Sequence, residues 1–277
     1  NGMFAFAAFD NKSKILYLVR DRIGIKPLYW GCLNGLLIFS SELKAFKHLK
    51  VWQPEIDINS VASFMRHNYI ASPNSIYKNI YKLAPGTILA IKKGGEPKLI
   101  TYWDFLKIAE KNSKNLATEN ANQIAEELEE LLLDSVERRM VSDVPIGTLL
   151  SGGIDSSTIT ALMAEIASGQ KINTFSVGFE EKGFDEAPFA KAVAKHLGTN
   201  HTELYAQPKD ALELIEKMPQ MYDEPFADVS SVPTFLISRF ARQHVTVCLS
   251  GDGGDELFAG YPRYFWGDTV EKLRKWL

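Results

Sequence analysis

Residues 151–157 read Ser-Gly-Gly-Ile-Asp-Ser-Ser, and this stretch decides which fold we expect. The apolar run Ile146–Leu150 before it is typical of a buried strand, and Ser156–Ala167 after it is typical of a helix. A glycine-rich turn between a strand and a helix favours an anion, because glycine allows close approach and the first helix amides point at the ligand. Asp155 would repel a phosphate there unless Mg²⁺ lies between them.

A second acidic loop, residues 250–256, reads Ser-Gly-Asp-Gly-Gly-Asp-Glu and follows the apolar run Val245–Leu249. In a parallel sheet both loops lie at the carboxyl ends of strands, where open α/β sheets bind ligands. Asp155 and Asp255 could then hold one or two Mg²⁺ ions from opposite sides. Each loop alone also fits a plainer explanation, as a strand-to-helix turn or as a solvated turn in which Asp255 caps a helix. Together the two loops favour a nucleotide site.

Around these loops, short apolar runs alternate with helical stretches, which predicts a parallel α/β sheet covered by helices. A striped helical stretch, Ile124–Met140, precedes them. The other expected strands are Asn173–Phe179 and His201–Tyr205, and the other expected helices are Ala187–Leu197, Asp210–Met218 and Pro233–Arg242.

The first 105 residues predict an antiparallel, turn-rich α+β layer with one helix, Asn59–Asn68. Its expected strands are Phe4–Phe9, Ile15–Arg20, Leu36–Ser40 and Thr87–Ile91. Residues 111–122 contain four asparagines and few apolar side chains, which is the composition of a linker. We therefore expect a domain at residues 1–112, a linker at 113–122 and a second domain at 123–277.

The composition excludes several classes of protein. The 277 residues include 31 Lys+Arg and 34 Asp+Glu, a net charge of −3 that argues against a nucleic-acid binder. A hydrophobic fraction of 45% and a charged fraction of 23% are ordinary for a globular chain and exclude disorder. The longest apolar runs fall far short of the roughly 20 residues that span a bilayer, so no membrane partner is expected.

Taken together, these motifs resemble the N-type ATP pyrophosphatases and, within that group, the family of glutamine-dependent asparagine synthetases. In the second part of the chain the resemblance rests on residues 151–157, Thr174–Phe179, Asp223–Ser231 and Ser250–Tyr261 (SGDGGDELFAGY). In the first part it rests on Arg20–Tyr29 (RDRIGIKPLY), Phe39–Glu42 and Ala84–Gly86, which resemble the distal half of a class II glutamine amidotransferase domain.

The resemblance implies site residues by position. Contacts to the adenosine part of ATP are implied for Leu149, Val177, Ser250 and Gly251. The pyrophosphate cradle is implied for Ser151, Gly152, Gly153, Ile154, Asp155, Ser156 and Ser157. Asp155 and Asp255 match the Mg²⁺ ligands. Asp252 is the implied catalytic residue, at a position linked to forming an acyl-adenylate where several family members have Glu, one methylene longer.

The activity that the resemblance implies is ATP-dependent amidation of aspartate to asparagine through a β-aspartyl-AMP intermediate, with ammonia supplied by glutamine. It also implies a cytoplasmic enzyme with ATP and Mg²⁺ as cofactors, and it leaves a homodimer open. Two alternatives remain at this stage. One is a related amidotransferase that modifies another carboxylate in surface-polymer or antibiotic biosynthesis, and the other is a non-catalytic nucleotide-binding module.

Several residues fit a structural role, and a residue that the family pattern contains is not found in this sequence. The chain opens on Asn1 and stops at Leu277, so we expect a fragment that lacks the amino-terminal cysteine nucleophile of the family's glutaminase and is incomplete for synthesis. Cys32 and Cys248 are internal and are expected to be small packed residues. Residues 20–22 (Arg-Asp-Arg) are expected to form a structural ion-pair turn. The acidic, hydroxyl-rich loop within 223–231 fits an acceptor-substrate pocket and ordinary loop solvation equally well.

Overall fold

The computed structural model describes residues 2–114, 116–180, 183 and 185–275. Asn1, Asn115 and Leu277 lie outside the described residues. The chain divides into two compact units: unit 1 comprises Asn1–Thr118 and Ile215–Asp228, and unit 2 comprises Glu119–Leu214 and Val229–Leu277. Residues 215–228 therefore group with the first part of the chain, whereas the expected domain division, which stays a prediction, assigns them to the second part.

Unit 1 contains two antiparallel sheets where the sequence predicted one antiparallel layer. The first sheet has the order β1 (Ala5–Asp10), β2 (Ile15–Arg20), β6 (Thr87–Lys92) and β7 (Lys98–Thr101). The second has the order β4 (Leu36–Ser40), β3 (Tyr29–Leu33) and β5 (Ile80–Lys82). The helices of this unit are η1 (Leu43–His48), α1 (Ile58–His67), α2 (Phe105–Asn112) and α7 (Met218–Met221).

Each sheet of unit 1 has its own apolar cluster. Leu18, Leu28, Leu83 and Leu89 are buried against the first sheet. The cluster of the second sheet joins β3, β4 and β5 to η1 and the 70–76 loop, and consists of Tyr29, Ile38, Leu43, Phe46, Ile70, Ile76 and Ile80. Leu16 and Ile91 also pack on the cluster of the first sheet, each two residues from its buried neighbour, Leu18 or Leu89, because alternate side chains of a strand point to the same face.

The turn after β2 is held by hydrogen bonds to the backbone, and not by the ion pairs that we expected. The buried Asp21 carboxylate accepts backbone N–H groups from Phe4 (3.1 Å), Gly24 (2.7 Å), Ile25 (2.9 Å) and Lys26 (2.9 Å). The Arg20 guanidinium donates to the carbonyls of Gly24, Lys26 and Leu83. Burial acts to raise the pKa of Asp21, but the four donors outweigh it and lower the pKa below its ordinary value. The structural role of the turn is therefore as expected, with different bonding.

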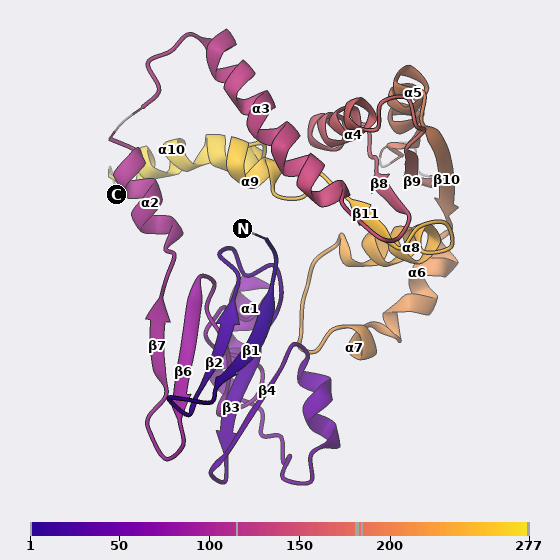
Figure 1. Ribbon diagram of the computed structural model, residues 1–277. Helices are drawn as coiled ribbons and strands as arrows, with labels where there is room; N and C mark the ends of the chain where they lie inside the picture. Colours follow the sequence, from indigo (N-terminus) through magenta and orange to yellow (C-terminus); the bar gives the residue numbers. More distant parts are fainter. Residues whose placement is uncertain (1, 115, 181–182, 184, 276–277) are drawn as a thin grey trace. The chain divides into compact units, whose positions relative to one another are not determined.

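Unit 2 is built on a parallel sheet with the strand order β10–β9–β8–β11, as the alternating pattern predicted (Figure 1). The strands are β8 (Ile146–Leu149), β9 (Asn173–Phe179), β10 (Asn200–Ala206) and β11 (Val247–Leu249). The helices are α3 (Ala121–Met140), α4 (Ile154–Ile166), α5 (Ala187–Leu197), α6 (Pro208–Ile215), α8 (Ser231–Ala241), α9 (Gly254–Phe258) and α10 (Pro262–Arg274).

Helices cover both faces of this sheet. On one face Val136 of α3 and Met163 of α4 pack with Leu249 of β11. On the other face Ile237 and Ala241 of α8 pack against Phe175 and neighbouring apolar side chains. Burial on both faces explains the apolar stretches Ile146–Leu150 and Val245–Leu249, whereas β9 and β10 contain more polar residues.

The two cysteines are free thiols in different surroundings. Cys32 is exposed on β3, so the expectation that it is packed is wrong. The pleat of β3 turns its side chain outward between the buried Gly31 and the half-buried Leu33. Cys248 is half-buried in β11, and burial raises the pKa of its thiol. None of the helices in the described ranges combines the length and the apolar character that crossing a bilayer requires.

Candidate active site

The strand order of unit 2 places two loops at one point of the sheet. β8 lies in the interior, its sequence successor β9 lies on one side of it, and β11 lies on the other side. The chain therefore changes direction across the sheet between β8 and β11. Ligands of open parallel sheets bind outside the carboxyl ends of the strands at such a switch point. The loops that leave β8 and β11 at this edge are residues 150–153 and 250–253.

The first loop is held in shape by its own serines. Ser151 and Ser156 place their hydroxyl oxygens 2.9 Å apart, and the Ser151 amide donates to Ser156 Oγ at 3.2 Å. Ser151 Oγ also accepts the amide of Gly153 at 3.2 Å. Gly153 is the N-cap of α4 and has no side chain to bond the first helix amides. Those amides are consequently suited to an anion, and the helix dipole favours one there.

The two glycines of this loop differ in what a side chain at their position would meet. Gly152 has a φ of +84°, and a Cβ there would lie 2.6 Å from the amide nitrogen of Ala190 in α5. Its close approach is therefore to α5, whereas the sequence suggested a close approach to a ligand. A Cβ on Gly153 would meet only Ser151 Oγ, at 3.3 Å. Gly153 is thus the glycine of the pair that leaves space for a bound group.

Two of the three serine hydroxyls expected in the cradle are turned inward. Ser156 is buried, and its hydroxyl also donates to the Gly153 carbonyl at 3.3 Å. The Ser157 hydroxyl is buried and has no hydrogen-bond partner among the described residues. Ser151 is exposed, as is Ile154, whose side chain keeps 85% of its accessible surface. The groups of this loop that face outward are therefore Ser151, Gly153 and the first turn of α4.

The second loop lies directly against the first turn of α4. A Cβ added to Gly251 would lie 2.7 Å from the amide nitrogen of Ser156 and 2.9 Å from Asp155 Cβ. A Cβ added to Gly254 would lie 2.3 Å from Asp155 Oδ2. Only glycine fits at these two positions, because Asp155 and the adjoining backbone occupy the space that any larger residue would need. The two acidic loops, about 100 residues apart in the sequence, meet at Asp155.

Asp155 and Asp255 are the candidate carboxylate ligands for Mg²⁺ in this site. The Asp155 carboxyl contacts Gly254, the chain neighbour of Asp255, and both aspartates are half-buried. Neither has an ion-pair partner among the described residues, so their negative charge is not neutralised by the protein there. The described residues contain no group of three or more acidic, His or Cys side chains placed to hold a metal. Two carboxylates with phosphate and water oxygens are a usual set for Mg²⁺.

Asp252 is exposed at the tip of the second loop. Its Oδ2 accepts the Ser250 hydroxyl at 2.9 Å, which fixes the carboxylate within its own loop. Gly253 follows with a φ of +96°, and no atom lies within 4 Å of where its Cβ would be, so this glycine is required by backbone conformation alone. The loop thus presents the carboxylate of Asp252 outward, whereas the carboxylate of Asp255 lies against Gly260.

Leu149 and Val177 form an apolar wall below the loops. Both are half-buried and pack on the cluster of Phe175, Ile237 and Ala241 at the α8 face of the sheet. Leu149 lies opposite Phe175 in the β8–β9 pair, and Val177 lies two residues further along β9. The structure therefore places these two expected adenosine contacts on the same face of neighbouring strands.

The acidic residues Asp223 and Glu224 are not part of this junction. They belong to unit 1, where Asp223 bonds the amides of Leu43 and Lys44 and Glu224 pairs with Lys82. The sequence suggested that this loop could line an acceptor pocket. No local signal reveals its actual contacts, because the partners lie roughly 140 to 180 residues away along the chain.

Comparison with known families gives two matches. Residues 127–277 match the family model described as asparagine synthase. Residues 1–103 match the family model described as a glutamine amidotransferase domain. The two models together cover both units, except for the stretch between 103 and 127.

Curated relatives match along nearly the whole chain. A putative asparagine synthetase [glutamine-hydrolyzing] 2 from Methanocaldococcus jannaschii is 42% identical over 100% of this chain and 53% of its own length. Asparagine synthetase [glutamine-hydrolyzing] 1 from Bacillus subtilis is 37% identical over 95% of this chain and 40% of its own. Amidase chry2 from Gibberella zeae is 28% identical over 99% of this chain and 42% of its own. The chain thus spans about half the length of the curated relatives that it matches.

Proposed function

Because the chain belongs to the asparagine synthase family, we propose that it is part of a glutamine-dependent enzyme that uses ATP to convert aspartate to asparagine. The observation that supports this proposal most directly is the meeting of the loops 151–157 and 250–256 at Asp155. Their position at the switch point of a parallel sheet is where a nucleotide would bind. A cytoplasmic location and a homodimer remain predictions of the family resemblance.

In this proposal the chain's own groups bind and orient the nucleotide. The first amides of α4 hold the pyrophosphate part, and Ser151 and Ser156 keep the loop in the shape that presents them. Leu149 and Val177 contact the adenosine part, together with Ser250 and Gly251 at the start of the second loop. Ile154 and Ser157 complete the stretch, Ile154 at its surface and Ser157 within α4.

Asp155 and Asp255 would hold Mg²⁺. The chemistry of the donors fits, since both side chains offer carboxylate oxygens, Asp155 contacts the chain neighbour of Asp255, and neither carboxylate has an ion-pair partner within the described residues. The ion supplies positive charge that offsets the charge developing on pyrophosphate. Without a cation, the two carboxylates would repel the phosphates that the helix amides attract.

The proposed reaction has two steps. An aspartate carboxylate attacks the α-phosphorus of ATP and displaces pyrophosphate, which gives β-aspartyl-AMP. Ammonia then attacks the acyl carbon and expels AMP. Positioning and charge stabilisation carry such chemistry, so no protein nucleophile is needed in unit 2. Asp252, exposed at the loop tip and held by Ser250, is the proposed catalytic carboxylate during adenylate formation.

Unit 1 supplies the second part of the proposal. Residues 1–103 match a glutamine amidotransferase domain, so glutamine is the proposed source of ammonia. Free ammonium should replace glutamine in the synthetase step, because only the ammonia enters the second step. We therefore propose aspartate, glutamine and ammonia as the small-molecule partners.

Calorimetric titration with ATP tests the nucleotide site. We expect the chain to bind ATP at least about tenfold more tightly with Mg²⁺ than with EDTA, and Asp155→Asn to abolish that difference. Asp143→Asn, which changes an exposed aspartate of the same unit, is the matched control and should keep the wild-type affinity. An affinity for ATP that is unchanged by Mg²⁺ and by Asp155→Asn would contradict the proposed metal site.

A different acceptor carboxylate is the second candidate function. It is supported by the relative named amidase chry2, which is 28% identical over 99% of this chain and is not named an asparagine synthetase. Pyrophosphate release with ATP, Mg²⁺ and ammonium separates the two functions. Release that depends on aspartate supports asparagine synthesis, whereas release that requires another carboxylic acid and ignores aspartate supports the alternative.

A further inference from the structure

Residues 215–228, which we call the docking segment, interrupt unit 2 in the sequence and fold as part of unit 1. Ile215 is both the last residue of α6 and the first residue of the segment, and α8 begins at Ser231 after the segment. The segment contains the short helix α7 and the sequence Tyr222–Phe226 (YDEPF). Its contacts with the rest of unit 1 are made mainly by two carboxylates.

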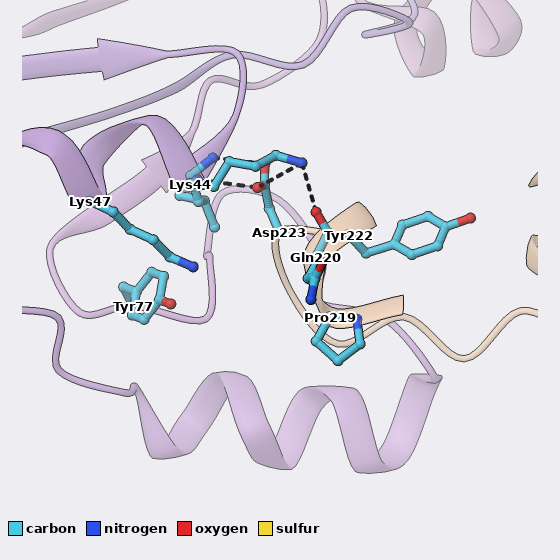
Figure 2. A pocket seen from close by; sticks show the side chains of 8 residues that line it. Lys44, Lys47, Tyr77, Pro219, Gln220, Tyr222 and Asp223 are labelled. Carbon is cyan, nitrogen blue, oxygen red and sulfur yellow. Dashed lines mark hydrogen bonds and ion pairs between the residues drawn. The ribbon is translucent and has the colours of Figure 1, made fainter. Parts of the chain in front are cut away.

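Asp223 caps a helix to which it is not connected in sequence. Glu42 is the N-cap residue of η1, but its side chain makes no capping hydrogen bond. Instead, Asp223 accepts the amides of Leu43 at 2.7 Å and Lys44 at 3.2 Å. The Lys44 ammonium in turn donates to the Gln220 carbonyl at 3.2 Å (Figure 2) and to the Met221 carbonyl, which the figure does not draw, also at 3.2 Å. The start of η1 is therefore satisfied by the docking segment.

Glu224 makes the second attachment. Its carboxylate pairs with the ammonium of Lys82 at the end of β5 and accepts the amide of Ile76 at 3.2 Å. Both side chains of the pair are largely buried, with 13% and 15% of their surfaces exposed. Burial raises the pKa of Glu224 in spite of this pairing. The Ala227 amide donates to the Asn68 carbonyl at 2.9 Å and completes the attachment.

The docking segment is packed loosely on unit 1. A pocket of about 220 Å³ remains between α7 and η1, lined by Lys44, Lys47, Tyr77, Pro219 and Gln220 among others (Figure 2). The aromatic contact of Phe226 is with Tyr222 of the same segment, and Phe226 keeps 44% of its surface exposed. The two carboxylates that attach the segment are themselves largely buried, with 11% of the Asp223 side chain and 13% of the Glu224 side chain exposed, so their contacts are costly to break.

The segment is followed in sequence by α8, a helix that packs beside the proposed nucleotide site. Two residues separate Asp228 from α8, whose Ile237 and Ala241 pack on Phe175. The apolar wall of Leu149 and Val177 rests on this same cluster. α8 is then followed by β11 and by the loop 250–256. A displacement at the start of α8 would therefore reach side chains beside both acidic loops through packed contacts.

We propose that the docking segment is a conformational link, in which its attachment to unit 1 through Asp223 and Glu224 sets the position of α8 and thereby the stability of the loops 151–157 and 250–256. The segment itself occupies the surface of unit 1 that is formed by the start of η1, Ile76 and Lys82. The inference rests on the proposed function only where it identifies those loops as the site of nucleotide binding.

Hydrogen exchange on the ligand-free chain tests the link. The variants are Asp223→Asn and Glu224→Gln, singly and together, and the control is Lys78→Ala, which removes the exposed ion pair of Lys78 with Glu55 in the same unit. We expect about tenfold faster exchange at the Leu43 and Ile76 amides in the variants and not in the control. We also expect faster exchange at hydrogen-bonded amides of unit 2, namely Thr234 in α8, Ser157 in the first loop and Leu257 after the second.

Two outcomes overturn the link. Faster exchange confined to unit 1 would mean that the segment is only a structural member of that unit. Unchanged exchange at Leu43 and Ile76 would mean that the two carboxylates do not hold it. The amides of Leu18 and Leu89 in paired strands report whether unit 1 is still folded. If the double variant loses protection at Leu18 and Leu89, unit 1 has unfolded in it, and the exchange rates of the two single variants then test the link.

A second arm adds Mg²⁺ and ATP and separates the link from the proposed function. Calorimetry first establishes whether ATP binds. If it binds, we expect slower exchange at Leu43 and Ile76, because ATP favours the attached segment, and a lower ATP affinity in the variants, because coupling is reciprocal. Binding without any change at those amides contradicts the link and leaves the proposed function intact. If ATP does not bind, the proposed function fails, and the ligand-free comparison still decides the link.

Discussion

At the scale of single residues, Gly152 meets two constraints at once. Its φ of +84° disfavours any residue with a side chain, and α5 occupies the space that a Cβ would fill. Gly169, in the turn after α4, has a similar φ of +94° but nothing within 4 Å. The pair therefore separates backbone strain from steric conflict within one unit.

We expect Gly169→Ala to cost about 1 kcal/mol of unfolding free energy and Gly152→Ala about 3 kcal/mol, because the second must also displace α5. Chemical denaturation followed by hydrogen exchange in β8 and β9 measures both. Equal losses in the two variants would show that the contact with α5 is not maintained in solution.

Asp21 is a second residue whose role is set by its partners. Its ionised carboxylate accepts four amides, so its pKa is lowered in the folded state. A lowered pKa means that this contribution to stability is present above the unfolded-state value of 3.8 and is lost as the pH falls through the folded-state pKa.

We expect Asp21→Asn to destabilise unit 1 by about 2 kcal/mol at pH 7, because one amide oxygen cannot replace two carboxylate oxygens for four donors. The loss relative to wild type should shrink below about pH 4, where Asp21 of the unfolded wild-type chain begins to take up a proton while the folded carboxylate stays ionised to lower pH. Asp10→Asn changes a half-buried aspartate at the end of β1 that accepts the Lys12 amide; it is the control and should show a smaller loss. A deficit for Asp21→Asn that is independent of pH would exclude the ionised carboxylate as its cause.

At the scale of elements, the pairing of β9 with β10 encloses a polar group that sequence patterns do not reveal. His201 of β10 lies with Nδ1 2.9 Å from Thr174 Oγ1 and Nε2 3.3 Å from Ser176 Oγ, both on β9. Burial lowers the pKa of His201, Glu203 acts in the opposite direction, and Lys191 adds to the lowering. The neutral imidazole is therefore favoured in the folded unit.

We expect the β9–β10 pair to lose stability as the pH falls from about 7.5 to about 5.5, because the unfolded chain takes up a proton near pH 6.5 and the folded one does so only at lower pH. Exchange at the Ser176 and Thr202 amides, corrected for intrinsic rates, measures this loss. In His201→Asn the dependence should be flatter than in wild type. The opposite slope in wild type would contradict a buried neutral histidine.

The helices and strands also differ in how well they can be predicted from the sequence. The sequence predicts α4, α5 and β9 within two residues of their bounds, although only α5 and β9 have a clear apolar period. β5 has only three residues, and β7 is exposed along its whole length, so neither provides a hydrophobic pattern. The sequence does not predict η1, whose amide cap comes from Asp223, so no local capping signal precedes it.

At the scale of the whole molecule, chain order and spatial grouping differ at one segment. Residues 215–228 follow three strands of unit 2 in the sequence, yet Asp223 and Glu224 bond to unit 1. A linear division of the sequence cannot detect this, because a carboxylate at 223 is equally compatible with water and with a distant helix terminus. Contact with amides 180 residues away is a property of the tertiary structure alone.

The amino-acid sequence by itself determined the alternation of strands and helices in unit 2, the two glycine-rich acidic loops and the family to which they point. These properties depend on side-chain periodicity and on residues close in the chain, which a sequence records directly. The tertiary structure alone decided that Gly254 lies against Asp155, that Gly152 accommodates α5, and that Asp223 caps η1. Those contacts join residues far apart in the chain, and only the packing of the strands and helices brings them within bonding distance.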